Sequence, residues 1–247
     1  MPGVGGGLVR DQAQRLRELT LVRRIPEPAF LPDAGRVIAV TSGKGGVGKT
    51  SIVANLGTLL ARRGLKVTLL DADFGLANID ILLNLSPAKN LGHLLRGEAA
   101  PSDVLVSAGQ GLKVIPGASG IAALADLERP EREALLSSLA PLTAGADLVF
   151  VDTSAGIGRN VVELCAASTE VLLVTNPEPT SITDAYGLIK VLVGKRPNCT
   201  VRLLVNSVSG AREARSVFFK LDQVASRFLD RRISYVGPIE RDDCFGR

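Results

Sequence analysis

The chain has 247 residues, 46% of them hydrophobic and 22% charged, so it is long enough for one large domain or two small ones and apolar enough to build a core. Its net charge of +4 suits an anionic ligand but is too small to indicate nucleic-acid binding by itself. One histidine and three widely spaced cysteines exclude a multi-histidine metal site and argue against a disulfide framework, and the lack of an apolar run of about 18 residues excludes a membrane-spanning helix.

Residues 1–34 differ in composition from the rest, and we expect them to form a flexible tail. Four glycines stand near its start, and residues 11–19 (DQAQRLREL) predict a short helix with Asp11 at its N-cap. The prolines that follow, Pro26, Pro28 and Pro32, break any helix and indicate a linker. Because the tail lacks the apolar core of a signal peptide and the cysteines are unpaired, we expect a cytoplasmic location.

Residues 35–247 alternate short apolar runs with helical segments. The predicted strands are 37–42, 66–73, 112–117, 147–153, 170–176, 201–208 and 233–239. The predicted helices are 50–63, 131–139, 161–167, 181–193 and 212–229. Such alternation predicts an α/β domain with a mostly parallel sheet of about seven or eight strands covered by helices on both faces.

Residues 43–50 (GKGGVGKT) fit the phosphate-loop pattern G-x-x-x-x-G-K-[ST] between a predicted strand and a predicted helix. Glycines let backbone N–H groups turn around phosphate oxygens, Lys49 reaches the β- and γ-phosphates, and the Thr50 hydroxyl binds Mg²⁺. We therefore predict a P-loop NTPase fold that binds ATP and Mg²⁺. The residues expected around the nucleotide are Gly43, Lys44, Gly45, Gly46, Val47, Gly48, Lys49, Thr50 and Ser51.

Aspartates follow two of the predicted strands, at the sheet edge where ligands bind in open α/β folds. We expect Asp73 to position the attacking water, Asp71 to hold the water shell of the metal, and Asp152 to act as the Walker B-like residue. Gly156 belongs to a second predicted switch, where a backbone N–H senses the γ-phosphate. The alternative is that these aspartates only cap the helices after them.

The stretch KGGVGKT resembles the deviant Walker A motif of the MinD/ParA ATPases. In that family the early lysine reaches the nucleotide of the partner subunit, so the resemblance implies an ATP-dependent homodimer with Lys44 crossing the interface as a catalytic residue beside Lys49 and Asp73. It also implies that Asn206 recognises the adenine and that the loop containing Ile239 lies against the base. Glu240 stands where the family has a proline.

Four stretches resemble the FlhG (FleN) flagellar-number regulators within this family. They are residues 71–85, 115–120, 152–158 and 176–190 (NPEPTSITDAYGLIK). Residues 11–17 (DQAQRLR) resemble the N-terminal motif by which those regulators stimulate the signal-recognition-particle-type GTPase FlhF. The resemblance implies a slow, partner-regulated ATPase in flagellum biogenesis. The residues expected to bind the GTPase are Asp11, Gln12, Ala13, Leu16 and Arg17. Flagellar switch-complex proteins and a flagellar transcription regulator are further candidate partners.

The family usually continues beyond the last strand to an amphipathic membrane-targeting helix, whereas this sequence stops at Arg247. Its last residues, ERDDCFGR, are too few and too charged to lie on a bilayer. We therefore expect little membrane binding by this chain alone, so any recruitment to the inner face of the membrane at a flagellar pole needs a partner.

A ParA-type DNA-segregation ATPase is the main alternative function. It would bind DNA non-specifically through surface cations, for which the candidates are Arg212, Arg215, Lys220, Arg227, Arg231 and Arg232. An iron–sulfur carrier of the same fold needs paired cysteines that the sequence lacks. A module that binds nucleotide without turnover is the remaining alternative.

Overall fold

The computed structural model describes residues 31, 34–118 and 129–242. The predicted helix at 11–19 and its GTPase-binding residues lie outside the described residues, as does nearly all of the proline-rich linker. Among the described residues, no helix combines the length and apolar character needed to cross a bilayer.

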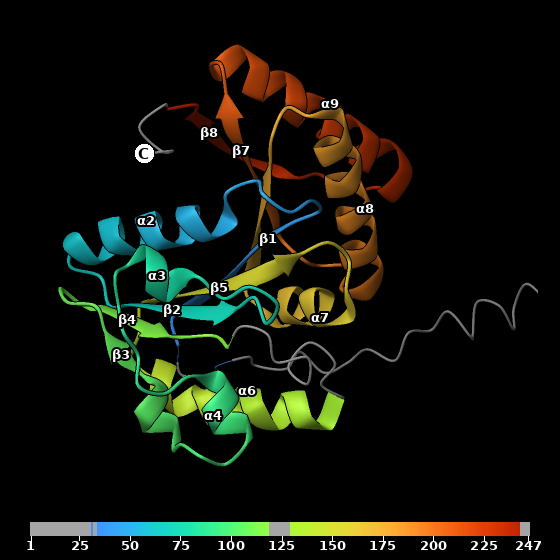
Figure 1. The fold of residues 1–247 in the computed structure, drawn as a ribbon. Coiled ribbons are helices and arrows are strands. Elements are labelled where there is room, and N and C mark those ends of the chain that lie inside the picture. The colour runs from blue at the N-terminus through green and yellow to red at the C-terminus, as the bar shows by residue number, and fades with distance from the viewer. Residues whose placement is uncertain (1–30, 32–33, 119–128, 243–247) are drawn as a thin grey trace, which may run out of the picture.

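An eight-stranded sheet forms the centre of the described chain, in the order β3-β4-β2-β5-β1-β6-β7-β8 (Figure 1). Neighbouring strands pair in parallel, except that β3 and β4 are antiparallel. The strands are β1 (Arg36–Ser42), β2 (Val67–Ala72), β3 (Val106–Ser107), β4 (Leu112–Ile115), β5 (Leu148–Ala155), β6 (Glu170–Thr175), β7 (Val201–Val208) and β8 (Ser234–Glu240). The predicted α/β fold with a mostly parallel sheet is confirmed.

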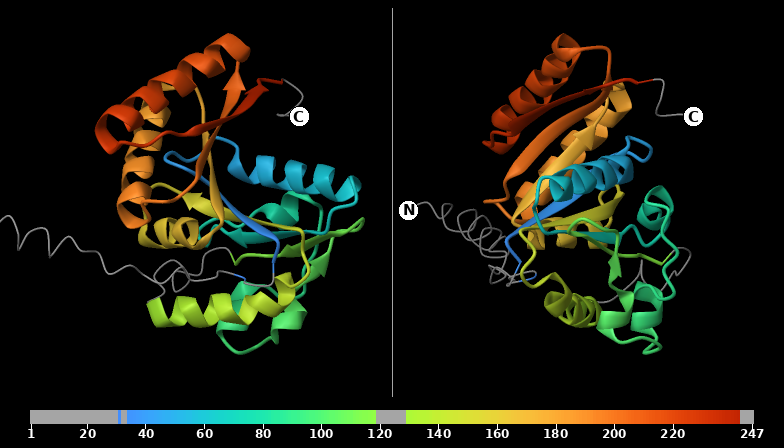
Figure 2. Two further views of the ribbon diagram at one scale, coloured as in Figure 1. Left: turned by 180° about the vertical axis from the view of Figure 1, so that it is seen from behind. Right: turned by 90° about the vertical axis from the view of Figure 1, so that its left-hand side faces the viewer.

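Helices cover both faces of this sheet (Figures 1 and 2). One face packs against α2 (Lys49–Arg62) and α3 (Ile79–Leu82) through an apolar cluster that includes Val40 and Phe150. The other face packs against α4 (Leu91–Leu95), η1 (Pro101–Val104), α6 (Arg129–Thr143), α7 (Arg159–Ala167), α8 (Pro179–Lys195) and α9 (Ala211–Leu229). Because both faces are covered, the central strands carry runs of apolar residues rather than an alternating pattern, and all six residues of β6 are buried.

Several elements differ from the prediction. The sequence pattern misses β3, α3 and η1, which have two to four residues each and are too short to display a period. Local side-chain contacts stabilise short elements of this kind, as when the N-cap residue Asn90 and His93 form a capping box on α4. Helix α8 begins at Pro179, earlier than predicted, because proline suits the first helical position.

Strand β1 lies between β5 and β6, where the chain switches from building one side of the sheet to building the other. In open α/β sheets a crevice forms at such a point, beyond the carboxyl ends of the strands. The phosphate loop, both acidic clusters and Asn206 all follow or end strands at this edge. The fold therefore gathers the predicted site residues of the described chain along one edge.

Candidate nucleotide site

The phosphate loop joins β1 to α2, as predicted (Figure 1). Gly46 and Gly48 have φ angles of +76° and +92°, a region that strains residues with a side chain. Gly43 is needed for space, because a Cβ there would lie 2.2 Å from the backbone carbonyl carbon of Asp184 in α8. No side chain caps the first turn of α2, so its N–H groups and helix dipole are available to an anion.

The other loop residues line or support this turn. Gly45 is exposed, and no atom lies within 4 Å of where its Cβ would be. Val47 points into the apolar cluster beneath the loop and is 2% exposed. Thr50 and Ser51, in the first turn of α2, are half-buried. The loop is thus anchored by one apolar side chain, while Gly45 and Gly46 at its middle face open space.

Lys49 is buried in the first turn of α2. Burial lowers the pKa of its ammonium, and the charges of Asp152 and Asp73 act in the opposite direction. The ammonium is therefore poorly solvated and close to carboxylates, so a phosphate group there would gain a strong charge-assisted partner.

Lys44 points toward the start of α8. Its ammonium pairs with the Glu178 carboxylate and donates a hydrogen bond to the Thr180 hydroxyl at 3.1 Å. This hydrogen-bonded pair holds the pKa of Glu178 below its usual value. The Lys44 carbonyl accepts a hydrogen bond from the Ser42 hydroxyl at 2.7 Å. Lys44 is thus tied within its own subunit.

Asp71, at the end of β2, is buried and accepts three backbone N–H groups, from Asp73, Asn78 and Ile79, at 3.0 to 3.2 Å. Two of these groups open α3, so the capping alternative describes this carboxylate well. Burial raises the pKa of Asp71 to about 6 despite the three hydrogen bonds. Asp71 therefore fixes the loop from β2 to α3, whatever else it contacts.

Asp73, two residues later, is half-buried and accepts hydrogen bonds on its Oδ1 atom only. The donors are the N–H groups of Gly75 and Leu76, at 3.2 and 3.3 Å, and the Ser154 hydroxyl of β5, at 2.9 Å. No described residue donates to Oδ2. One carboxylate oxygen thus anchors the first switch while the other stays available to a water.

Asp152 lies in β5 opposite Asp71 in the register of β2 and β5 and is fully buried. Neither of its oxygens has a hydrogen-bond partner among the described residues. Its pKa is raised to about 7, chiefly by burial; the nearby Thr50 hydroxyl and Lys49 ammonium lower it, and the charges of Asp71 and Asp73 raise it. A buried carboxylate without a partner indicates a missing cationic or hydrogen-bonding ligand.

This orphaned carboxylate fits a magnesium site beside the phosphate loop. Mg²⁺ keeps several waters and is held by one or two protein oxygens together with nucleotide phosphates. Within the described ranges no three His, Cys, Asp or Glu side chains gather as a ligand set. The residues present therefore suit a metal carried by a triphosphate better than a protein-only metal site.

Three further predicted residues lie around the loop. The Gly156 N–H, proposed to sense the γ-phosphate, donates to the Ser42 carbonyl at 2.8 Å, so sensing would require that bond to open. The Asn206 amide donates to the Val47 carbonyl at 2.8 Å, which places it against the phosphate loop. Ile239 of β8 is half-buried and packs on the same apolar cluster as Val47. The structure thus places Asn206 against the loop and Gly156 beside the end of β1.

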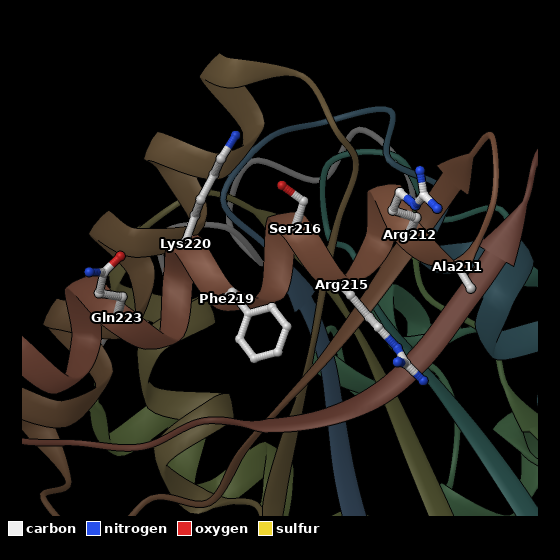
Figure 3. A pocket seen from close by; sticks show the side chains of 7 residues that line it. All are labelled: Ala211, Arg212, Arg215, Ser216, Phe219, Lys220 and Gln223. Carbon is white, nitrogen blue, oxygen red and sulfur yellow. The ribbon is translucent and has the colours of Figure 1, made fainter.

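The basic residues of the DNA-binding alternative are partly gathered on α9. Figure 3 shows Arg212 and Lys220 on one side of the helix and Arg215 and Phe219 on another, around a shallow pocket. Phe219 is exposed while its neighbour Phe218 packs on the core. Arg232 differs from these residues, because its guanidinium forms an ion pair with the buried Asp222.

Sequence reasoning missed Ser42, Ser154, Glu178 and Thr180 as parts of this site. Ser154 could have been found from strand register, because it follows Asp152 by two residues just as Asp73 follows Asp71. Glu178 and Thr180 flank the proline that starts α8, directly after a predicted strand. Strand order was needed to place that helix beside Lys44.

Comparison with known proteins gives consistent matches. The CobQ/CobB/MinD/ParA nucleotide binding domain matches residues 38–247. The antiactivator FleN of Pseudomonas aeruginosa is 44% identical over 208 residues, which cover 84% of this chain and 74% of FleN. The flagellum site-determining protein YlxH of Helicobacter pylori is 36% identical over 249 residues, covering 97% of this chain and 81% of YlxH. The cell division ATPase MinD of Pyrococcus furiosus has a TM-score of 0.69 and 26% identity, with 84% of each chain covered.

Proposed function

Since the chain belongs to the CobQ/CobB/MinD/ParA family of nucleotide-binding domains, as its motifs predicted, we propose that it is an ATP-driven dimerisation switch that regulates flagellar number or placement. The observation that carries the proposal is the juxtaposition of the phosphate loop, the buried Lys49 and the unpartnered Asp152 at one sheet edge. The names of the relatives FleN and YlxH support the flagellar assignment.

The proposed nucleotide is ATP with Mg²⁺. Backbone N–H groups of residues 43–51 would hold the phosphates, and Lys49 would contact the β- and γ-phosphates. Thr50 would bind the metal directly, while Asp152 and, secondarily, Asp71 would accept its waters. Mg²⁺ bound there neutralises charge that develops on the phosphate oxygens. The Asn206 amide and Ile239 would lie against the adenine.

We assign hydrolysis to Asp73. Its Oδ2 atom accepts no hydrogen bond from the described residues, and its Oδ1 atom is fixed by three donors. A carboxylate held in this way can orient a water for in-line attack on the γ-phosphate. Lys49 stabilises the charge that accumulates on the phosphoryl oxygens, and the second switch at Gly156 would close when the phosphate displaces Ser42 from its N–H.

Dimerisation is assigned to Lys44. Glu178 and Thr180 hold its ammonium within its own subunit. A triphosphate in a second subunit offers more negative charge than one carboxylate, so the ammonium would leave Glu178 and cross the interface. The ATP dimer would then present Gln12 of the N-terminal segment to the GTPase FlhF, where a glutamine amide can orient a hydrolytic water.

Light scattering with and without ATP tests the switch. We expect the wild-type chain to dimerise with ATP and Mg²⁺, and Asp73→Ala to persist as a dimer because it cannot hydrolyse the nucleotide. Lys44→Ala should bind nucleotide and stay monomeric. An Asp73→Ala variant that is monomeric at saturating ATP contradicts the dimer switch. A peptide of residues 11–17 that leaves GTP turnover by FlhF unchanged contradicts the activator role, and a wild-type chain that releases no phosphate contradicts the ATPase.

The exposed cations of α9 favour one alternative, ATP-dependent non-specific DNA binding of the ParA type (Figure 3). Retention on DNA at low salt that requires ATP and falls steeply with added salt would support it. We expect no such retention.

A further inference from the structure

One hydrogen bond links the two predicted switches directly. The Ser154 hydroxyl, on β5, donates to the Asp73 carboxylate, in the loop after β2, at 2.9 Å. The two residues are 81 positions apart in the chain, yet both are half-buried at the same sheet edge. Ser154 is the only described side chain that donates to Asp73, because the other two donors are backbone N–H groups of the same loop.

Strand register explains why these residues meet. In the parallel pairing of β2 with β5, Asp71 is opposite Asp152 and Ala72 is opposite Thr153. Continuing that register by one position puts Asp73 beside Ser154. Two residues further along, the Gly156 N–H is bound to the Ser42 carbonyl, which ties this end of β5 to β1. The hydroxyl is therefore presented from a strand that is fixed on both sides, whereas Asp73 lies in a loop.

The contact determines how the Asp73 carboxylate is turned. A carboxylate bound only by its own loop can rotate about its last side-chain torsion, which is broad and nearly two-fold. A third donor from a fixed strand distinguishes the two oxygens, because it holds Oδ1 and leaves Oδ2 for water. A small rotation of a water-orienting group is enough to slow an in-line attack.

We propose that Ser154 is a positioning residue for ATP hydrolysis, acting by holding one oxygen of Asp73 so that the other faces the attacking water. The inference rests on the proposed function, since it needs Asp73 to orient that water. Ser154 itself would touch neither nucleotide nor water. Its contribution should appear in turnover and not in nucleotide affinity.

The test compares Ser154→Ala with Ser154→Thr, which keeps the hydroxyl, in the full-length chain. Single-turnover phosphate release gives the hydrolysis rate, and binding of a fluorescent ADP analogue gives affinity. We expect Ser154→Ala to slow hydrolysis about tenfold, the size of loss that misplacement of a reacting group produces. Affinity for ADP and the melting temperature should stay close to wild type, and Ser154→Thr should recover most of the rate.

A double mutant separates positioning from a general structural effect. In the Asp73→Ala background, adding Ser154→Ala should change the residual rate less than about twofold, because the two residues act through one contact. Wild-type turnover by Ser154→Ala, or an equal loss in both backgrounds, would overturn the inference while leaving the proposed ATPase intact. A wild-type chain without phosphate release would overturn the proposed function as well.

Discussion

Asp152 is the clearest case of a single residue whose surroundings affect its charge. Its carboxylate is buried without a hydrogen-bond partner, and its pKa is raised to about 7. Because its folded pKa lies above its unfolded value, the neutral form is favoured by folding. The stabilising effect is complete in acid and is lost as the pH rises from about 4 through 7.

We therefore predict that Asp152→Asn, which is neutral at every pH, stabilises the nucleotide-free chain above pH 7. The expected gain at pH 8 is about 2 kcal/mol, or about 4–8 °C in melting temperature. At pH 5 the variant and wild type should differ little. Thermal unfolding at the two pH values measures this, and a variant less stable than wild type at pH 8 would contradict it. The same variant should weaken Mg²⁺-dependent nucleotide binding.

The glycines of the phosphate loop allow a matched pair of substitutions. A Cβ at Gly43 would clash with the backbone of Asp184, which cannot move without shifting α8, whereas a Cβ at Gly45 meets open space. We predict that Gly43→Ala costs about 2–4 kcal/mol of unfolding free energy and that Gly45→Ala costs less than about 1. Urea denaturation compares the two, and equal losses would show that the Gly43 backbone can shift freely.

At the scale of elements, helix α9 has one face that packs on the core and another that is exposed to solvent. Phe218 packs on the apolar cluster between the sheet and helices α8 and α9. Its ring also lies against the Tyr235 ring, with centroids 5.0 Å apart, while Phe219 is 62% exposed. We predict that Phe218→Ala destabilises the fold by about 2–3 kcal/mol and that Phe219→Ala changes stability by less than about 0.5. Urea denaturation of the two variants measures both values. A large loss from Phe219→Ala would mean that it packs on something in solution.

The long elements could be predicted from the sequence because burial on both faces leaves an unmistakable apolar run in strands such as β6. The phosphate loop could be predicted because the spacing of its glycines, lysine and threonine is specific to phosphate binding. The short elements could not, since α3 depends on the Asp71 carboxylate eight residues before its first N–H. The contacts of Lys44 with α8 and of Ser154 with Asp73 depend on which strands are neighbours, and no local pattern encodes strand order.

At the scale of the whole molecule, Lys44 contacts Glu178 and Thr180 at the start of α8 in its own subunit. Glu178 therefore competes with a partner subunit for that ammonium. We predict that Glu178→Gln, which removes the competing charge, lowers the ATP concentration needed for half-maximal dimerisation several-fold, on the order of 3- to 10-fold. Asp184→Asn, on the same helix, is the matched control and should leave this concentration unchanged.

Sedimentation at graded ATP concentrations measures the effect of Glu178→Gln. A higher ATP requirement would show that Glu178 supports the dimer instead of opposing it. Lys44→Ala should cancel the difference between Glu178→Gln and wild type, because the proposed effect passes through that one ammonium.

The hydrogen bond from the Asn206 amide to the Val47 carbonyl bears on which purine base the proposed site would accept. A carbonyl accepts but cannot donate, so it fixes the NH₂ end of the Asn206 side chain toward the loop and turns the amide oxygen the other way. That oxygen can accept from the exocyclic amine of adenine, but it would meet the keto oxygen of guanine with two acceptors face to face. Under the proposed assignment of Asn206 to the base, we therefore expect the chain to bind ATP in preference to GTP.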